Sequence, residues 1–200
     1  VFAQVYELPR SLSVRQAPAA IFSQARESMP IEEGLAAADF QELGNSKNAA
    51  WYLFAATYAT LVDEYVSVFQ SLRLKVSLMT MESLALGAAI IDERNPETTL
   101  VLDVGSRTTI ASVFQNGALQ ESININIAGN AITASLAEKL KISQADAEQR
   151  KIASGLTAAP GDGAEMLIIQ GQLQPPKDEL LVFIKYFEKH HGQPINRVLL

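Results

Sequence analysis

The stretch Leu100-Val-Leu-Asp103-Val-Gly105-Ser-Arg-Thr108-Thr109 is the most informative part of this 200-residue chain. An apolar, β-rich run delivers Asp103 at its carboxyl end, and Gly105 permits a tight turn or a close backbone approach. Thr108 and Thr109 then open the next strand. Such a turn can point backbone N–H groups at a phosphate, and the carboxylate beside it can hold Mg²⁺ through water. The alternative reading is a plain β-hairpin, because Asp-x-Gly is a common turn.

A hairpin is expected immediately after this stretch. Thr109–Gln115 and Ala118–Ile127 are the two predicted strands, and the Asn116-Gly117 pair between them is typical of a type I′ turn. Two helices should follow. The second opens on Ser143 and Asp146, which resemble a capping box, and ends near Gly155, a C′ glycine.

Residues 157–200 are predicted to mix loop, strand and helix. Thr157–Glu165 is rich in Gly and Pro and reads as a loop, and Met166–Ile169 reads as a short strand. Asp178–His190 has helical spacing with three large apolar residues on one face. Arg197–Leu200 begins one more strand.

The first half of the sequence also predicts regular secondary structure. Val1–Tyr6 and Ala49–Ala56 are expected strands, and Ala17–Met29 is an expected helix that Pro30 stops. Residues 31–48 are polar and should be mostly loop, with a short strand near Ala38–Gln41.

An amphipathic helix comes next in the chain. Its predicted apolar face consists of Leu61, Tyr65, Val68, Phe69 and Leu72. Leu74–Met79 alternates like a strand, and Met81–Ile91 is an apolar helix.

Composition excludes several classes of function. The net charge is −6 and no dense Lys/Arg run occurs, so we expect no nucleic-acid binding. The chain has no cysteine, which excludes disulfides and thiolate metal sites. No apolar run is long enough to span a bilayer. The chain does not begin with Met and it ends on an apolar run, so we expect both ends to continue.

The order of these elements resembles a known superfamily. An apolar helix, the Asp-x-Gly-x-x-Thr strand and turn, a hairpin and then Ala147-Glu148-Gln-Arg-Lys151 resemble the second half of the actin-like, RNase H-like ATPase fold. Within it, the chain is most similar to the PilM family of type IV pilus assembly proteins. The implied fold is α/β with a mixed sheet: residues 1–79 as a small α+β subdomain of the 1C type, and 80–200 as part of the second nucleotide domain.

The resemblance implies an ATP and Mg²⁺ site. Asp103 would be the catalytic residue, positioning Mg²⁺ through water together with the attacking water. The implied nucleotide contacts are Gly105, Ser106, Thr108, Thr109, Gly129, Glu148 and Lys151, the last two meeting the nucleoside. Residues three apart share a helix face, although Glu148 and Lys151 alone would read as a solvated surface pair.

The sequence also departs from the family pattern. No stretch of the chain matches the first phosphate loop of the family, and the usual Gly-Gly adenosine motif would come only after Leu200. At the position of a second Gly-Gly pair of the family, this chain has Ala128-Gly129. The chain therefore holds about half of a nucleotide site, and we expect at most weak ATPase activity and weak ATP binding.

The resemblance further implies a cytoplasmic protein held at the inner membrane through partners. The main expected partner is a PilN-like cytoplasmic tail docking near the small subdomain, and self-association is a further expectation. The loose acidic cluster Glu32, Glu33, Asp39 and Glu42 is either a solvated loop or a partner surface. Two alternatives stay open: a GspL-like secretion scaffold that does not use nucleotide, and an FtsA-like division protein.

Overall fold

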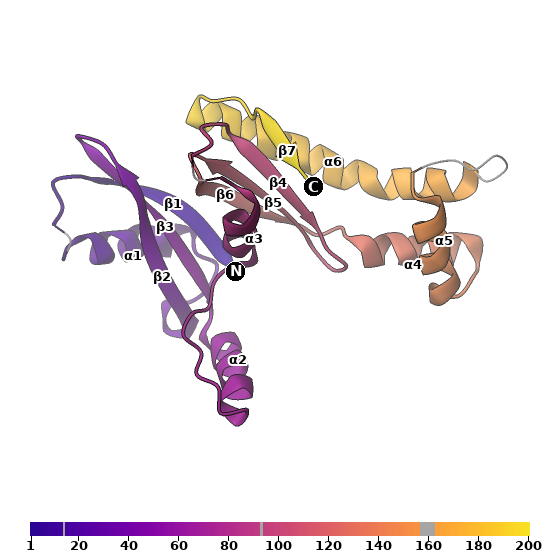
Figure 1. Ribbon diagram of the computed structural model, residues 1–200, viewed down its shortest axis with the longest axis horizontal. Coiled ribbons are helices and arrows are strands. Elements are labelled where there is room, and N and C mark those ends of the chain that lie inside the picture. The colour runs from indigo at the N-terminus through magenta and orange to yellow at the C-terminus, as the bar shows by residue number, and fades with distance from the viewer. Residues whose placement is uncertain (14, 93, 157–162) are drawn as a thin grey trace. The chain divides into compact units, whose positions relative to one another are not determined.

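The computed structural model describes residues 1–13, 15–92, 94–156 and 163–200. The chain forms two compact units (Figure 1). The first, called here the N-terminal unit, comprises Val1–Pro96 with the hairpin tip Phe114–Ser122. The second, the C-terminal unit, comprises Glu97–Val113 and Ile123–Leu200.

A three-stranded antiparallel sheet organises the N-terminal unit. Its strands, in the spatial order β1-β3-β2, are β1 (Phe2–Pro9), β3 (Ala49–Tyr58) and β2 (Ala36–Asn45). Helix α1 (Ala17–Ser28) packs against it, and the short 3₁₀ helix η1 (Glu33–Leu35) precedes β2. The predicted strands at the N-terminus and at Ala49–Ala56 and the helix at Ala17–Met29 are confirmed.

The core of this sheet gathers around one ring. Phe54, on the central strand, is completely buried, and Phe2, Tyr6 and Phe22 meet it edge-to-face with ring centroids 5.3–6.4 Å apart. Ile21 of α1 is also fully buried in this cluster. Aromatic side chains on a central strand bury a large apolar surface when a helix packs over them. This burial explains why the apolar, aromatic run Ala49–Tyr58 forms the central strand β3.

The polar segment 31–48 contains more strand than its composition predicts. Only Ala38–Gln41 was expected to be extended, whereas β2 runs for 10 residues. The physical reason is its edge position: β2 pairs with β3 along one side, and an edge strand accepts polar residues on a solvated face.

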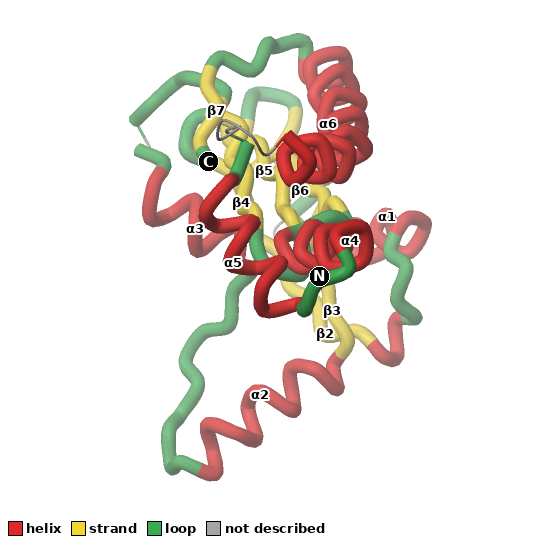
Figure 2. The backbone as a smooth tube through the Cα atoms, turned by 90° about the vertical axis from the view of Figure 1, so that its right-hand side faces the viewer, coloured by secondary structure: helices red, strands yellow, loops and turns green. Residues whose placement is uncertain are grey.

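Helix α2 (Ala59–Ser71) forms as predicted, but it contains no buried residue. The prediction of a strand at Leu74–Met79 is wrong, since the segment has no regular secondary structure. Alternation alone does not make a strand where no neighbouring strand offers hydrogen bonds. Figure 2 shows the segment between α2 and α3 (Glu82–Ile90) as an extended loop.

A four-stranded sheet ordered β6-β5-β4-β7 organises the C-terminal unit, apart from the hairpin tip Phe114–Ser122, which is grouped with the N-terminal unit. Its strands are β4 (Thr99–Val104), β5 (Thr109–Gln115), β6 (Ala118–Ile125) and β7 (Arg197–Leu199), with β7 parallel to β4. Asn116 and Gly117 both have positive φ, at 50° and 76°, which confirms the predicted type I′ turn between β5 and β6.

The described part of this unit also contains the helices α4 (Gly129–Leu140), α5 (Gln144–Ser154) and α6 (Gly163–His191). The second half of α6 covers the sheet, because Phe183 and Phe187 are buried against Leu100, Val113 and Ile125. The predicted N-cap of α5 is confirmed, since the Ser143 hydroxyl accepts from the Asp146 amide at 3.1 Å.

The long helix α6 corrects a prediction. Met166–Ile169 is not a strand but part of α6, which continues through Pro175 and Pro176 to His191. Prolines usually end a helix. Here both halves are held by packing, the first through Ile169 on α4 and α5 and the second through Phe187 on the sheet. Of the predicted loop Thr157–Glu165, residues 157–162 lie outside the described residues, and Gly163 begins α6.

None of the helices within the described ranges combines the length and the apolar character that crossing a membrane requires.

Candidate functional site

The turn between β4 and β5 places the first group of predicted site residues. Asp103 is half-buried near the end of β4. The turn is tight: the amide of Gly105 donates to the Thr108 carbonyl at 3.0 Å. A Cβ at Gly105 would lie only 2.9 Å from that same oxygen, so glycine is required there.

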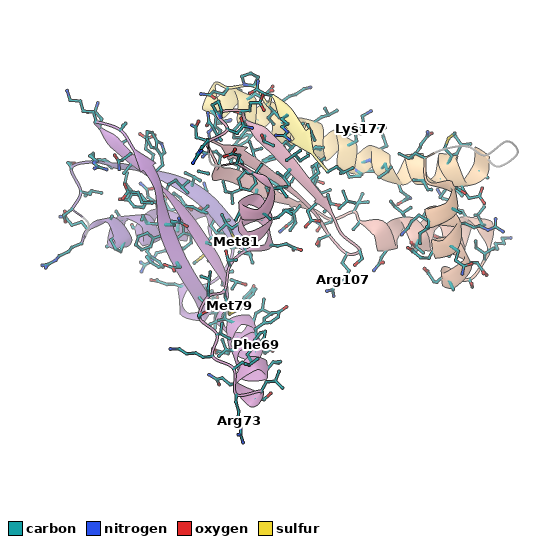
Figure 3. The ribbon with its side chains drawn as sticks, in the orientation of Figure 1. Phe69, Arg73, Met79, Met81, Arg107 and Lys177 are labelled. Carbon is teal, nitrogen blue, oxygen red and sulfur yellow. The ribbon has the colours of Figure 1, made fainter. Side chains whose placement is uncertain are left out.

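The tip of this turn presents main-chain donors. Ser106, Arg107 and Thr108 are all exposed, and Arg107 is labelled in Figure 3. In the described part of the chain, no hydrogen bond engages the amides of these three residues. Successive free N–H groups in a turn form an anion-binding concavity, so this tip has the chemistry to receive phosphate oxygens.

Thr109 is arranged differently from its neighbours. It is 7% exposed, and its hydroxyl donates to the Ile127 carbonyl at 2.7 Å. This hydrogen bond joins β5 to the segment after β6 and so holds the turn between β4 and β5 in place.

The start of α4 is attached to the same turn. The amide of Gly129 donates to the Gly105 carbonyl at 3.1 Å, and that of Asn130 donates to the Ser106 carbonyl at 2.8 Å. A Cβ on Gly129 would lie 3.5 Å from the Gly105 carbonyl oxygen. The first amides of α4 thus fix the turn rather than face an anion.

Helix α5 brings the second group of predicted residues to the start of α4. Lys151 Nζ donates to the Gly129 carbonyl at 3.1 Å, to Thr133 Oγ1 at 2.9 Å and to Glu148 Oε2 at 2.7 Å. The Thr133 hydroxyl also contacts Glu148 Oε2 and the Gly129 carbonyl. Gly105, Gly129, Glu148 and Lys151 therefore belong to one connected network.

The charges of this network are mutually stabilising. The hydrogen bond from Lys151, followed by that from Thr133, lowers the pKa of Glu148 below its ordinary value. The Lys151 side chain is 20% exposed, against 44% for Glu148, so the ammonium is the more enclosed partner. The pair is thus more than the solvated surface pair that its sequence alone suggests.

A second ion pair fixes α5 to α6. Arg150 Nη1 lies 2.9 Å from Glu165 Oε1, and Glu165 is 3% exposed. The pKa of Glu165 is lowered, first by a main-chain hydrogen bond within the residue and then by Arg150. This contact positions the helix that carries Glu148 and Lys151.

Sequence reasoning missed Thr133 and Asn130. Thr133 faces Gly129 four residues earlier, a common place for a helical threonine hydroxyl, but nothing local shows that α5 supplies its other partners. For the metal, no group of three or more His, Asp or Glu side chains converges within the described residues. Mg²⁺ is commonly held by one or two carboxylates plus substrate phosphates, so Asp103 alone fits that role.

The N-terminal unit contains a separate cavity of about 290 Å³. Its lining includes Leu8, Arg10, Leu12, Glu42 and Tyr52. Arg10 and Glu42 form an ion pair at 3.5 Å, and the Tyr52 hydroxyl donates to Glu42 Oε2 at 3.5 Å. Burial, followed by Glu42, raises the pKa of Tyr52. The acidic residue Glu42 of the predicted cluster therefore belongs to a partly enclosed site.

Comparison with known proteins identifies the class of fold. The family model "Cell division protein FtsA" matches residues 100–179. The cell division protein FtsA of Neisseria meningitidis serogroup B (strain ATCC BAA-335 / MC58) is 30% identical over 115 residues, covering 56% of this chain and 28% of that protein.

Two solved structures support the same class. The PilM-PilN type IV pilus biogenesis complex matches with a TM-score of 0.77 and 17% identity, over 94% of this chain and 55% of that one. MreB 5 of Spiroplasma citri bound to AMPPNP matches with a TM-score of 0.51 and 14% identity, over 91% of this chain and 70% of that one.

The chain has the α/β fold of the actin-like ATPases, as the sequence predicted. It spans about half of the PilM chain and 28% of the Neisseria relative.

Proposed function

We propose that this chain supplies the second half of an actin-like nucleotide site in an assembly scaffold. The observation that carries the proposal is the connected set of Gly105, Gly129 and Lys151, next to a turn tip whose amides bond to no other described residue. A polyphosphate needs donors on a rigid frame, and this network supplies both.

Each residue has a definite part in the proposed site. The amides of Ser106 and Thr108 bind phosphate oxygens, and Gly105 allows the turn to approach them. Asp103 holds hydrated Mg²⁺, which when bound neutralises phosphate charge. Thr109 holds the turn through Ile127.

On the nucleoside side, Glu148 and Lys151 are the polar groups that α5 presents beside Gly129. Lys151 is already hydrogen-bonded to the main chain, so its charge is pre-positioned instead of being ordered by the ligand. Glu148 is the more exposed of the two, and its carboxylate, already paired through Oε2 with Lys151 and Thr133, would accept a ribose hydroxyl through Oε1.

This half-site should bind ATP weakly by itself. Calorimetric titration of the chain with Mg-ATP is expected to give no binding in the micromolar range, because the other lobe's contacts are missing. In the intact protein, Asp103→Ala should weaken Mg-dependent nucleotide binding while leaving the melting temperature nearly unchanged. Asp178→Ala, an exposed carboxylate on α6, is the matched control. Unchanged affinity for Asp103→Ala would remove Asp103 from the site.

As the biological setting we propose type IV pilus assembly at the cytoplasmic side of the inner membrane. The supporting observation is that the PilM match covers both units of the chain, including the small sheet that we assign to the 1C-type subdomain. The proposed partner is a PilN-like cytoplasmic tail, and the cavity beside Arg10 and Glu42 is its proposed dock.

The docking proposal is tested by titrating the chain with a synthetic peptide of a PilN cytoplasmic tail. Arg10→Glu should weaken peptide binding at least about tenfold, whereas Arg26→Glu should not. Both arginines sit in exposed ion pairs, with Glu42 and Glu33 respectively, so the fold should tolerate either change. Equal effects of the two variants would contradict docking at the cavity.

An FtsA-like division protein is the second candidate, favoured by the family model and the Neisseria relative. The matched residues 100–179 lie mainly in the C-terminal unit, which holds the nucleotide half-site in both candidates. The partner therefore discriminates: binding to a tubulin homologue instead of the PilN tail would favour the division role. Assembly without any response to nucleotide would favour a GspL-like scaffold.

A further inference from the structure

Arg107 lies at the tip of the turn between β4 and β5, and its side chain has no partner among the described residues. The turn closes through the hydrogen bond from the Gly105 amide to the Thr108 carbonyl, so Ser106 and Arg107 are its central residues. Arg107 is exposed, and Figure 3 shows its side chain just beyond the tip of the turn. No ion pair within the described ranges uses its guanidinium group.

The other basic group of the proposed nucleotide site is already engaged. Lys151 Nζ donates to the Gly129 carbonyl, to Thr133 Oγ1 and to Glu148 Oε2. Its charge is therefore balanced by the carboxylate of Glu148, 2.7 Å away. Asp103 adds a further negative charge. The side chains assigned to the site so far are thus net acidic, although the proposed ligand is an anion.

A polyphosphate bound at this turn therefore needs additional positive charge. Hydrated Mg²⁺ held by Asp103 would supply part of it. A guanidinium group is well suited to supply the rest, because its planar fork donates paired hydrogen bonds to a phosphate and it stays charged at every physiological pH. Arg107 offers this group directly between Ser106 and Thr108, whose amides have the arrangement that receives phosphate oxygens.

The order of the contacts places Arg107 at the end of the site away from the nucleoside. Lys151, on the proposed nucleoside side, donates to the Gly129 carbonyl, and the Gly129 amide donates to the Gly105 carbonyl at 3.1 Å. Gly105 begins the turn, and Arg107 lies at its tip. A polyphosphate that starts beside Glu148 and runs past Gly129 therefore reaches Arg107 with its last phosphate group.

We propose that Arg107 is a specificity-determining residue of this site, whose guanidinium group binds the terminal phosphate of a nucleoside triphosphate and so favours the triphosphate over the diphosphate. The inference rests on the proposed function, since it requires that the polyphosphate binds at the turn after β4. The Asp-x-Gly-x-x-Thr pattern leaves position 107 open, so the motif by itself assigns no role to this arginine.

Calorimetric titration of the intact protein with Mg-AMPPNP, a triphosphate analogue that resists hydrolysis, and with Mg-ADP tests the proposal. Arg107→Ala should raise the dissociation constant of Mg-AMPPNP at least about tenfold and that of Mg-ADP less than about threefold, because the diphosphate lacks the group that the guanidinium binds. Arg107→Lys should give an intermediate loss, since an ammonium group keeps the charge but not the paired hydrogen bonds.

Arg197→Ala is the matched control, because it removes the same charge from the same unit. Arg197 is also exposed, and it lies on β7 opposite Thr99, at the other end of β4 from the turn. Salt screens a charge at that separation, so both dissociation constants should stay within about twofold of the wild type. Equal effects of Arg107→Ala and Arg197→Ala would mean that only net charge matters, and would overturn the proposal.

The same titrations separate this inference from the proposed function. A wild-type protein that binds both ligands, while Arg107→Ala changes neither affinity or weakens both equally, would overturn the role of Arg107 and leave the nucleotide site standing. A wild-type protein that binds neither ligand would overturn the nucleotide site and the role of Arg107 with it. Both arginines are exposed, so the melting temperature of each variant should stay close to that of the wild type.

Discussion

The ammonium group of Lys151 donates a hydrogen bond to the main-chain carbonyl of Gly129, 3.1 Å away. Gly129 in turn donates its amide to the carbonyl of Gly105. A side chain in α5 thereby reaches, through the first residue of α4, the turn that follows β4. The turn that follows β4 is therefore linked through hydrogen bonds to the helix that carries Glu148 and Lys151.

Lys151→Met should destabilise the C-terminal unit by about 1–2 kcal/mol, because it removes a charged donor and leaves the Gly129 carbonyl and the Glu148 carboxylate without that partner. Urea denaturation gives the change in unfolding free energy. Lys177→Met, at an exposed lysine of α6, is the control and should have little effect (Figure 3). Equal stabilities for Lys151→Met and the wild type would show that the network does not hold the helices together.

Thr133→Val should also be destabilising, by about 1 kcal/mol or more, since the hydroxyl it removes contacts Gly129, Glu148 and Lys151. The two side chains share partners, so the effect of the Thr133→Val, Lys151→Met double variant should be non-additive. Measuring all four proteins of this double-mutant cycle checks the prediction. Strict additivity would mean that Thr133 and Lys151 act independently.

Stability should depend on acid pH through Glu148. Its pKa is lowered from the ordinary value of 4.5 in the folded state, so its contribution is complete above about that pH. The contribution is lost as pH falls through the lowered pKa, because the protonated carboxyl no longer pairs with Lys151. The difference in stability between the wild type and Glu148→Gln should therefore shrink below pH 4.5. A difference that stays constant at acid pH would contradict the ion pair.

Gly87→Ala should be strongly destabilising for a steric reason. A Cβ at Gly87 would clash with the buried ring of Phe114, and overpacking of this kind costs about 1–3 kcal/mol. Gly171→Ala is the control: it is also a helical glycine, with nothing within 4 Å of the added atom, and should stabilise α6 by up to about 1 kcal/mol. Adding Phe114→Leu to Gly87→Ala should recover part of the loss in thermal unfolding. Destabilisation that Phe114→Leu does not relieve would point to another cause.

Local signals predicted much of the secondary structure. The Asn116-Gly117 turn and the Ser143 cap depend on interactions within a few residues, so the sequence was sufficient to find them. The same holds for the tight turn at Gly105. The errors occurred where pairing or packing over long distances decides the conformation. Leu74–Met79 alternates but pairs with no strand among the residues that the structure describes, and the first half of α6 is held by α4 and α5.

Backbone preferences and apolar spacing along the chain were enough to predict the turn after Asp103, the hairpin and the order of elements of an actin-like fold. Packing between separate segments, in contrast, brings Lys151 and Thr133 to the start of α4 and leaves α2 without a buried residue. Those outcomes depend on how separate segments pack, and the free energy of packing is not encoded in any one segment.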